Sequence, residues 1–329
     1  MALTAAIFGP EGPEITPWER DFFAETQPFG FIVFARNIET PDQLRRLTAN
    51  LREAVGRDAP ILIDQEGGRV QRMGPPHWRQ YLPALDQMAR ATDPLRAQWV
   101  RNRLIASDLQ AVGINVNCVP LADLSQDDTH PVLKNRLYGD DPALVIEAAH
   151  TCADAHLAGG VLPVLKHIPG HGRATLDSHL ELPRVDAARA DLTARDFAVF
   201  KALNDLPLGM SAHIVFEDID PSGPATTSPV MIDLIRQDIG FDGLLMTDDL
   251  SMQALSGSVG QRSTAAIRAG CDLILHCNGD AAEMDEVAKA AGPMNDQAMA
   301  RANRALAMLQ PPQEIDIPAL EAELADLLG

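Results

Sequence analysis

Short apolar runs recur along the chain, and most are followed by a polar or glycine-rich turn and then by a longer stretch with helical spacing. A run of four to eight apolar residues between turn residues is typical of a buried strand. Because parallel neighbours need a crossover helix, this alternation predicts a parallel sheet. The predicted strands span residues 4–8, 30–34, 61–64, 114–118, 162–166, 208–213, 243–247 and 273–276.

The stretches between these runs predict the helices that cover the sheet. Several open with a capping residue and a proline, as at Thr40-Pro41 and Asp93-Pro94, where the missing N–H of proline costs nothing. Strand–helix units repeated eight times in 329 residues favour a single-domain (β/α)8 TIM-type barrel over a doubly wound sheet. After about residue 312 we expect a C-terminal helical extension, from 318 to 328, on the outside of the barrel. The other predicted helices span residues 41–55, 94–112, 142–158, 187–203, 229–239, 260–269 and 281–290.

The composition narrows the possible partners and the compartment. The chain carries 27 Lys and Arg against 46 Asp and Glu, a formal net charge of −19, which repels a phosphate backbone and predicts no nucleic-acid partner. Its four cysteines have no C-x-x-C spacing, so we expect reduced thiols and neither a zinc site nor a disulfide framework. The N-terminus has no basic segment and no apolar run reaches about 18 residues, so we expect a cytoplasmic protein that does not bind membranes. We also expect a monomer.

Residues 166–179 concentrate titratable side chains and glycines directly after the apolar run at 161–165. Active sites of barrels gather at the C-terminal ends of the strands, so this segment is a candidate catalytic loop. Lys166 and His167 abut the strand end, where side chains point into a pocket. His171 lies between two glycines, and it fits a loop-packing role as well as a functional one.

Asp177 and His179 are two residues apart, which in an extended loop places both side chains on one side. An aspartate that accepts a hydrogen bond from one ring nitrogen leaves the other free for proton transfer. A metal is the competing interpretation of so many histidines and aspartates. The chain has no H-E-x-x-H spacing, and the nearby lysine and arginine disfavour a cation, so we expect no metal and no cofactor.

Other strand ends add candidates. Asp248 follows the apolar run at 243–247, and a carboxylate there is hard to bury unless it is hydrogen-bonded or used. Its neighbour Asp249 also fits a helix cap. Asp64 and Arg72 suit a paired acceptor and a fork donor for hydroxyl or amide groups. Arg136 follows the fourth strand, where a surface salt bridge is the alternative interpretation.

Taken together, these blocks resemble the family 3 glycoside hydrolases, in particular the single-domain β-N-acetylglucosaminidases that recycle bacterial cell-wall fragments. The matching segments occur in the family's order, and the resemblance extends over about residues 3 to 310. They are residues 31–38, 63–72, 166–172 with 177–179, and 246–252.

The resemblance implies a barrel fold and a retaining hydrolase that releases terminal N-acetylglucosamine (GlcNAc) from GlcNAc-anhydroMurNAc and its peptides. It implies Asp248 as the nucleophile that forms a glycosyl-enzyme intermediate, and His179 as the general acid/base with Asp177 as its partner. The family usually carries Ser-Phe where this chain has Leu137-Tyr138, a departure beside the implied Arg136. The sugar-binding residues that it implies are Asp64, Arg72, Arg136, Lys166 and His167.

Rival interpretations remain at this point. A histidine in place of an anionic acid would admit phosphate as the nucleophile, so a phosphorolytic enzyme or a β-glucosidase of the same family is the first alternative. A non-catalytic muropeptide-binding regulator is an alternative of another class. An aldolase or isomerase is the weakest, because the eighth turn at residues 276–280 is acidic where a phosphate site should be.

Overall fold

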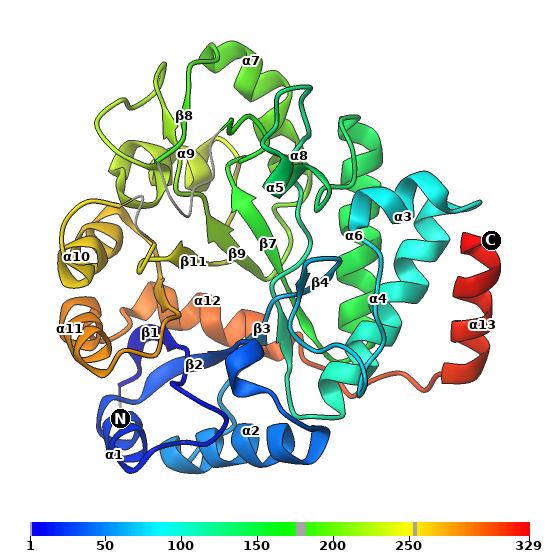
Figure 1. The fold of residues 1–329 in the computed structure, drawn as a ribbon. Coiled ribbons are helices and arrows are strands. Elements are labelled where there is room, and N and C mark those ends of the chain that lie inside the picture. Colours follow the sequence, from blue (N-terminus) through cyan, green and yellow to red (C-terminus); the bar gives the residue numbers. More distant parts are fainter. Residues whose placement is uncertain (1, 176–181, 253–254) are drawn as a thin grey trace.

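The computed structural model describes residues 2–175, 182–252 and 255–329 of the chain. Within them, parallel strands close into a barrel in the order β1-β12-β11-β9-β7-β6-β3-β2, and helices surround it (Figure 1). Strand β1 pairs with both β2 and β12, which closes the sheet. The predicted fold class is confirmed. The barrel strands are β1 (Thr4–Phe8), β2 (Pro28–Val33), β3 (Ile61–Ile63), β6 (Val116–Asn117), β7 (Leu162–Ile168), β9 (Leu208–Ser211), β11 (Leu244–Asp249) and β12 (Leu273–His276).

Each predicted strand overlaps one barrel strand. The runs at 4–8 and 273–276 match β1 and β12 residue for residue, whereas the run at 114–118 forms a strand only at Val116–Asn117. The apolar side chains of these strands are almost fully buried, because the barrel interior and the outer helices cover both faces of the sheet.

Capping explains why the predicted helices begin where they do. The side chains of Thr40, Asp93 and Ser228 each accept a hydrogen bond from a backbone N–H of the first turn, and proline follows each of them. The helices are α1 (Pro17–Thr26), α2 (Pro41–Val55), α3 (Ala84–Arg90), α4 (Pro94–Gln110), α5 (Pro131–Lys134), α6 (Pro142–Ala158), α7 (Arg189–Ala194), α8 (Asp196–Ala202), α9 (Pro229–Gln237), α10 (Val259–Ala269), α11 (Ala281–Ala291), α12 (Asp296–Ala307) and α13 (Ile317–Leu328).

The prediction of one helix over residues 187–203 is wrong. The backbone breaks at Arg195, which has φ −122° and ψ −71°, so that α7 and α8 are separate helices. The break lets buried Asp196, the first residue of α8, accept a hydrogen bond from Arg173 in the candidate catalytic loop. Helices α1, α3, α5 and α12 had no counterpart among the predicted helices.

Helix α13 lies on the outside of the barrel against α4 (Figure 1). Arg96 of α4 donates two hydrogen bonds to Glu323, and Arg79 pairs with Glu321. These ion pairs are solvent-exposed, so they fix the position of α13 more than they add stability. No helix in the described part of the chain combines the length and the apolar character needed to span a membrane.

Two small sheets lie outside the barrel. Strands β4 (Gln65–Gly67) and β5 (Val70–Gln71) form an antiparallel hairpin just after β3, and β8 (Arg184–Val185) pairs with β10 (Val215–Phe216). The hairpin turns the chain back, so that Arg72 donates a hydrogen bond to Asp64. The backbone N–H groups of Arg72 and Met73 donate to the buried side-chain oxygen of Gln65. These hydrogen bonds fix the position of the segment that carries Arg72.

Candidate active site

A cavity of about 300 Å³ opens at the C-terminal ends of the barrel strands. This volume is at the lower end of the usual range for ligand pockets and suits a single sugar ring. Every sugar-binding candidate from the sequence lines it, as does Asp248. The lining residues with ionisable side chains are Asp64, Arg69, Arg72, His130, Arg136, Lys166, His167, His171, Asp248, Asp249 and Cys277.

Charged groups form a continuous chain along one wall of this cavity. Arg72 lies 3.2 Å from one oxygen of Asp64, and Lys166 Nζ donates to the other at 2.9 Å. The same ammonium lies 2.7 Å from Glu66, which accepts two further hydrogen bonds from Arg136 at 2.8 and 2.7 Å. Carboxylates therefore alternate with cations along this wall, and Arg72 and Asp64 pair with each other.

The electrostatics keep these groups charged at neutral pH. Burial by itself would raise the pKa of Asp64, but Lys166 and Arg72 outweigh it and hold that pKa far below its usual range. For Glu66, burial is likewise outweighed by Arg136 and Lys166, which lower the pKa to about 2. Burial would lower the pKa of Lys166, yet Asp64 and Glu66 raise it above its ordinary value. Fixed charges of both signs therefore face a ligand in the cavity.

Glu66 belongs to this network although sequence reasoning did not single it out. Its side chain is only 5% exposed, and it is the residue that joins Arg136 to Lys166. The interpretation of Arg136 as part of a surface salt bridge is wrong, because its guanidinium is largely buried against Glu66. The available signal was the position of Glu66 two residues after Asp64 at a strand end.

Asp248 ends up in the cavity from β11, as the apolar run before it predicted. The backbone N–H of Asp249 donates to its carboxylate at 2.8 Å. Burial would raise the pKa of Asp248, but His213, His167 and this N–H group together lower it. The carboxylate is therefore ionised at neutral pH, the state that a nucleophile needs.

Asp249 and His213 are neighbours of Asp248, and both side chains make hydrogen bonds to other residues. The carboxylate of Asp249 accepts hydrogen bonds from the N–H and Oγ of Ser251 and from the N–H of Cys277, so it closes the turn after β11. The ring nitrogens of buried His213 bond Thr226 Oγ1 at 2.8 Å and the carbonyl oxygen of Asp249 at 3.1 Å. Both side chains therefore have hydrogen-bond partners of their own.

The candidate catalytic loop is tied to the segment after β6. Ala122 N–H donates to Lys166 O, and His130 N–H donates to Ala174 O. Between these points, Thr129 Oγ1 donates to Gly172 O at 2.5 Å. The first half of the loop therefore has a fixed path past the cavity. Asp177 and His179 lie outside the described residues.

Asp123 is a second carboxylate that sequence reasoning missed. It is fully buried, and it accepts a hydrogen bond from His167 Nδ1 at 2.8 Å. The backbone N–H of His171 donates to the same carboxylate at 2.7 Å. Burial, with the neighbouring His167, lowers the pKa of His171 to about 4, so its ring is neutral at neutral pH.

Metal chemistry finds no support in the described part of the chain. There, no cluster of three or more histidine, cysteine, aspartate or glutamate side chains has an arrangement that could hold a metal ion. The carboxylates of the cavity instead have lysine, arginine, histidine or backbone N–H partners.

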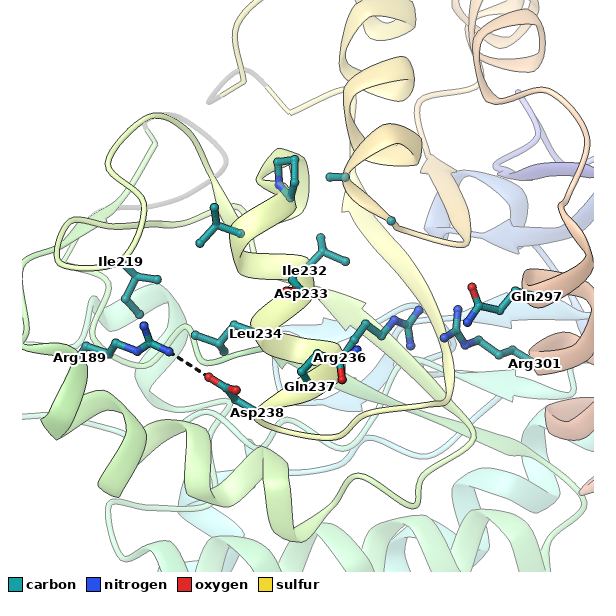
Figure 2. Close-up of a pocket in the computed structure, with 14 residues that line it drawn as sticks. Arg189, Ile219, Ile232, Asp233, Leu234, Arg236, Gln237, Asp238, Gln297 and Arg301 are labelled. Carbon is teal, nitrogen blue, oxygen red and sulfur yellow. Dashed lines mark hydrogen bonds and ion pairs between the residues drawn. The ribbon is translucent and has the colours of Figure 1, made fainter.

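A larger hollow of about 770 Å³ lies on the outer surface beside α9 and α12 (Figure 2). Most of its charged residues are paired: Arg189 with Asp238, and both Arg236 and Arg301 with Asp272. None of its lining residues also lines the cavity at the barrel mouth. Size alone does not make it the active site, and we assign that to the barrel mouth.

The comparisons with known proteins agree with this geometry. Residues 17–309 match the model of the glycosyl hydrolase family 3 N-terminal domain. A β-hexosaminidase from Alkalilimnicola ehrlichii is 35% identical over 286 residues, which cover 84% of this chain and 82% of the relative. The chain belongs to glycoside hydrolase family 3.

Solved structures extend the likeness of this family 3 chain to its whole length. NagZ from Neisseria gonorrhoeae, in complex with N-trifluoroacetyl-D-glucosamine, is 28% identical with a TM-score of 0.88, and the match covers 100% of this chain and 99% of that one. A family 3 β-N-acetylglucosaminidase from a Paenibacillus species is also 28% identical, with a TM-score of 0.86 over 98% of this chain and 67% of that one. The protein is therefore a glycoside hydrolase with a carbohydrate substrate.

Proposed function

We propose that this enzyme is a retaining, exo-acting β-N-acetylglucosaminidase that releases terminal GlcNAc from peptidoglycan fragments. The observation that carries the proposal is ionised Asp248 in a one-sugar cavity that the charged residues Asp64, Arg72, Arg136 and Lys166 also line. Relatives described as β-hexosaminidases, and a related structure with a bound glucosamine derivative, support the choice of sugar.

In the proposed mechanism, the wall residues hold the hydroxyl and acetamido groups of the sugar. Carboxylate oxygens of Asp64 accept from hydroxyl groups, while Arg72, Arg136 and Lys166 donate. His167 contacts the sugar from the β7 side. The small volume leaves room for one ring, and this supports removal of a single terminal residue.

The chemical steps run between Asp248 and the loop. Asp248 attacks the anomeric carbon, the bond from that carbon to the leaving oxygen breaks, and His179 gives its proton to that oxygen. His179, oriented by Asp177, then takes a proton from water, which displaces Asp248 and yields the β-anomer. The roles of His179 and Asp177 rest on the sequence motif.

Hydrolysis of a chromogenic β-N-acetylglucosaminide tests this proposal. We expect Asp248→Ala to abolish turnover and His179→Ala to slow it by a factor on the order of 10² to 10⁴. Proton NMR of the first product should show the β-anomer. Full activity of the Asp248 variant, or the α-anomer as first product, would refute the mechanism.

The natural substrate needs a separate measurement. We expect the enzyme to release GlcNAc from purified GlcNAc-anhydroMurNAc peptides. We also expect light scattering to give the mass of a monomer. The phosphorolytic alternative predicts a sugar 1-phosphate when inorganic phosphate is added. Release of free GlcNAc with no GlcNAc 1-phosphate in phosphate buffer would exclude that alternative.

A further inference from the structure

Asp123 follows β6 and lies directly behind the cavity wall formed by His167. Every hydrogen bond that described residues donate to its carboxylate comes from the end of β7 or from the residues just after it: from His167 Nδ1 at 2.8 Å, His171 N–H at 2.7 Å and His167 N–H at 3.3 Å. A carboxylate with 0% exposure and three donors has a fixed position.

This arrangement decides which ring nitrogen of His167 carries the proton. Burial would raise the pKa of Asp123, but His167 and the N–H of His171 lower it, so the carboxylate is ionised. An ionised carboxylate only accepts hydrogen bonds, so His167 Nδ1 must be the donor. The opposite nitrogen, Nε2, has no partner among the described residues, and the ring lines the cavity together with Asp248.

We propose that Asp123 is a positioning residue for the hydrolase reaction: it holds His167 in the tautomer protonated at Nδ1, so that Nε2 accepts a hydrogen bond from a sugar hydroxyl. The inference rests on the proposed role of His167 in sugar binding. By holding His171 N–H as well, the same carboxylate fixes the ring and the entry to the catalytic loop in one geometry.

Asp123→Asn is the informative substitution, because it keeps the size of the side chain and removes one acceptor. When the side-chain oxygen of the introduced asparagine accepts from the backbone N–H groups of His167 and His171, its NH2 group faces His167 Nδ1 and donates a hydrogen bond to it. His167 would then move its proton to Nε2 and present a donor to the sugar. We expect kcat/KM to fall by a factor on the order of 10².

A double-mutant cycle separates positioning from general structural damage. If Asp123 acts through His167, then adding Asp123→Asn to His167→Ala should change kcat/KM by less than about threefold. Asp272→Asn is the matched control, since Asp272 is also buried and ion-paired but lies by the outer hollow. Its kcat/KM per folded molecule should equal that of the wild type.

The ring itself provides the second measurement. Nitrogen-15 NMR of histidine-labelled protein at pH 8, with His167 assigned through His167→Gln, should show a proton on Nδ1 in the wild type and on Nε2 in Asp123→Asn. A proton on Nε2 in the wild type would overturn the inference even if the Asp123 variant failed to fold.

Several kinetic results would also overturn the inference. Multiplicative effects in the cycle, or wild-type kcat/KM in Asp123→Asn, would overturn it. Full activity in His167→Ala would remove both the sugar-binding role of His167 and the inference, while hydrolysis by the wild type would still stand. Failure of the proposed function itself would show differently, as a wild-type protein that releases no GlcNAc.

Discussion

Replacing Glu66 with glutamine tests whether the charged wall of the cavity is held together as described. The change keeps the shape of the side chain but removes the carboxylate that joins Arg136 to Lys166. Both cations would then depend on Asp64, which already binds Lys166 and Arg72. Removing one partner from a buried ion pair costs about 3–5 kcal/mol.

The pKa of Glu66 independently gives a similar magnitude for the destabilisation expected in Glu66→Gln. A folded pKa of about 2, against about 4.3 in the unfolded chain, corresponds to roughly 3 kcal/mol at about 1.36 kcal/mol per unit. Because the folded pKa is the lower one, this contribution is fully present above about pH 5 and is lost as the pH falls toward 2. The difference in unfolding free energy between wild type and variant should therefore shrink over that range.

Thermal and urea unfolding provide the assay. For 329 residues, an unfolding entropy of about 2.1 cal/mol/K per residue converts 3–5 kcal/mol into a Tm decrease of about 4–7 °C at pH 7. We also expect kcat/KM to fall on the order of 10- to 100-fold, because Arg136 and Lys166 lose their fixed positions.

Glu323→Gln is a matched control for this experiment. Glu323 also accepts two hydrogen bonds from one arginine, Arg96, but it lies on the exposed surface of α13. An exposed pair contributes about 0–1 kcal/mol, so the Tm should change by no more than about 1 °C. The reasoning fails if the two variants melt alike, or if Glu66→Gln retains wild-type kcat/KM.

Two further substitutions address other parts of the site. In Gly172→Ala the new methyl group would overlap the carbonyl oxygen of Leu124, so we expect the free energy of unfolding in urea to fall by about 1–3 kcal/mol and kcat to fall at least tenfold. In the control, Gly12→Ala, the methyl group would lie in open space, and both quantities should match those of the wild type. Asp64→Asn should lower kcat/KM by a factor on the order of 10² through a lost acceptor for the sugar. We expect it to destabilise the fold less than Glu66→Gln, because the side chains of Asp64 and Arg72 are 17% and 27% exposed, against 5% and 14% for Glu66 and Arg136; equal destabilisation of the two variants would contradict the account of the network.

The barrel could be predicted from the sequence because its strands and helix starts are local signals. The apolar run at 4–8 is stopped by Gly9 and Pro10, and it matches β1 residue for residue. Helix α1 was missed although Thr16 and Glu19 form a capping box and Pro17 opens the helix, since its apolar spacing is weak. The break at Arg195 could not be predicted, because the contact that accompanies it joins Asp196 to a residue 23 positions earlier.

The residues of the candidate site likewise fall into those that local sequence predicts and those that depend on distant partners. Asp64, Lys166 and Asp248 follow apolar runs, so their positions at strand ends were predictable. The roles of Glu66 and Asp123 depend on partners far along the chain: Arg136 is 70 residues from Glu66, and His167 is 44 residues from Asp123. Only the closed barrel brings such pairs together, so a single sequence carries little sign of them.

The central claim is that Asp248 is the nucleophile in this cavity. It is tested most directly by reacting the enzyme with a fluorinated GlcNAc donor whose glycosyl-enzyme hydrolyses slowly, followed by mass spectrometry of the digested protein. We predict one sugar per chain, attached to the peptide that contains Asp248 and localised to that residue by fragmentation. A sugar on Asp249 or Asp64, or turnover with no adduct and the α-anomer as first product, would contradict the claim.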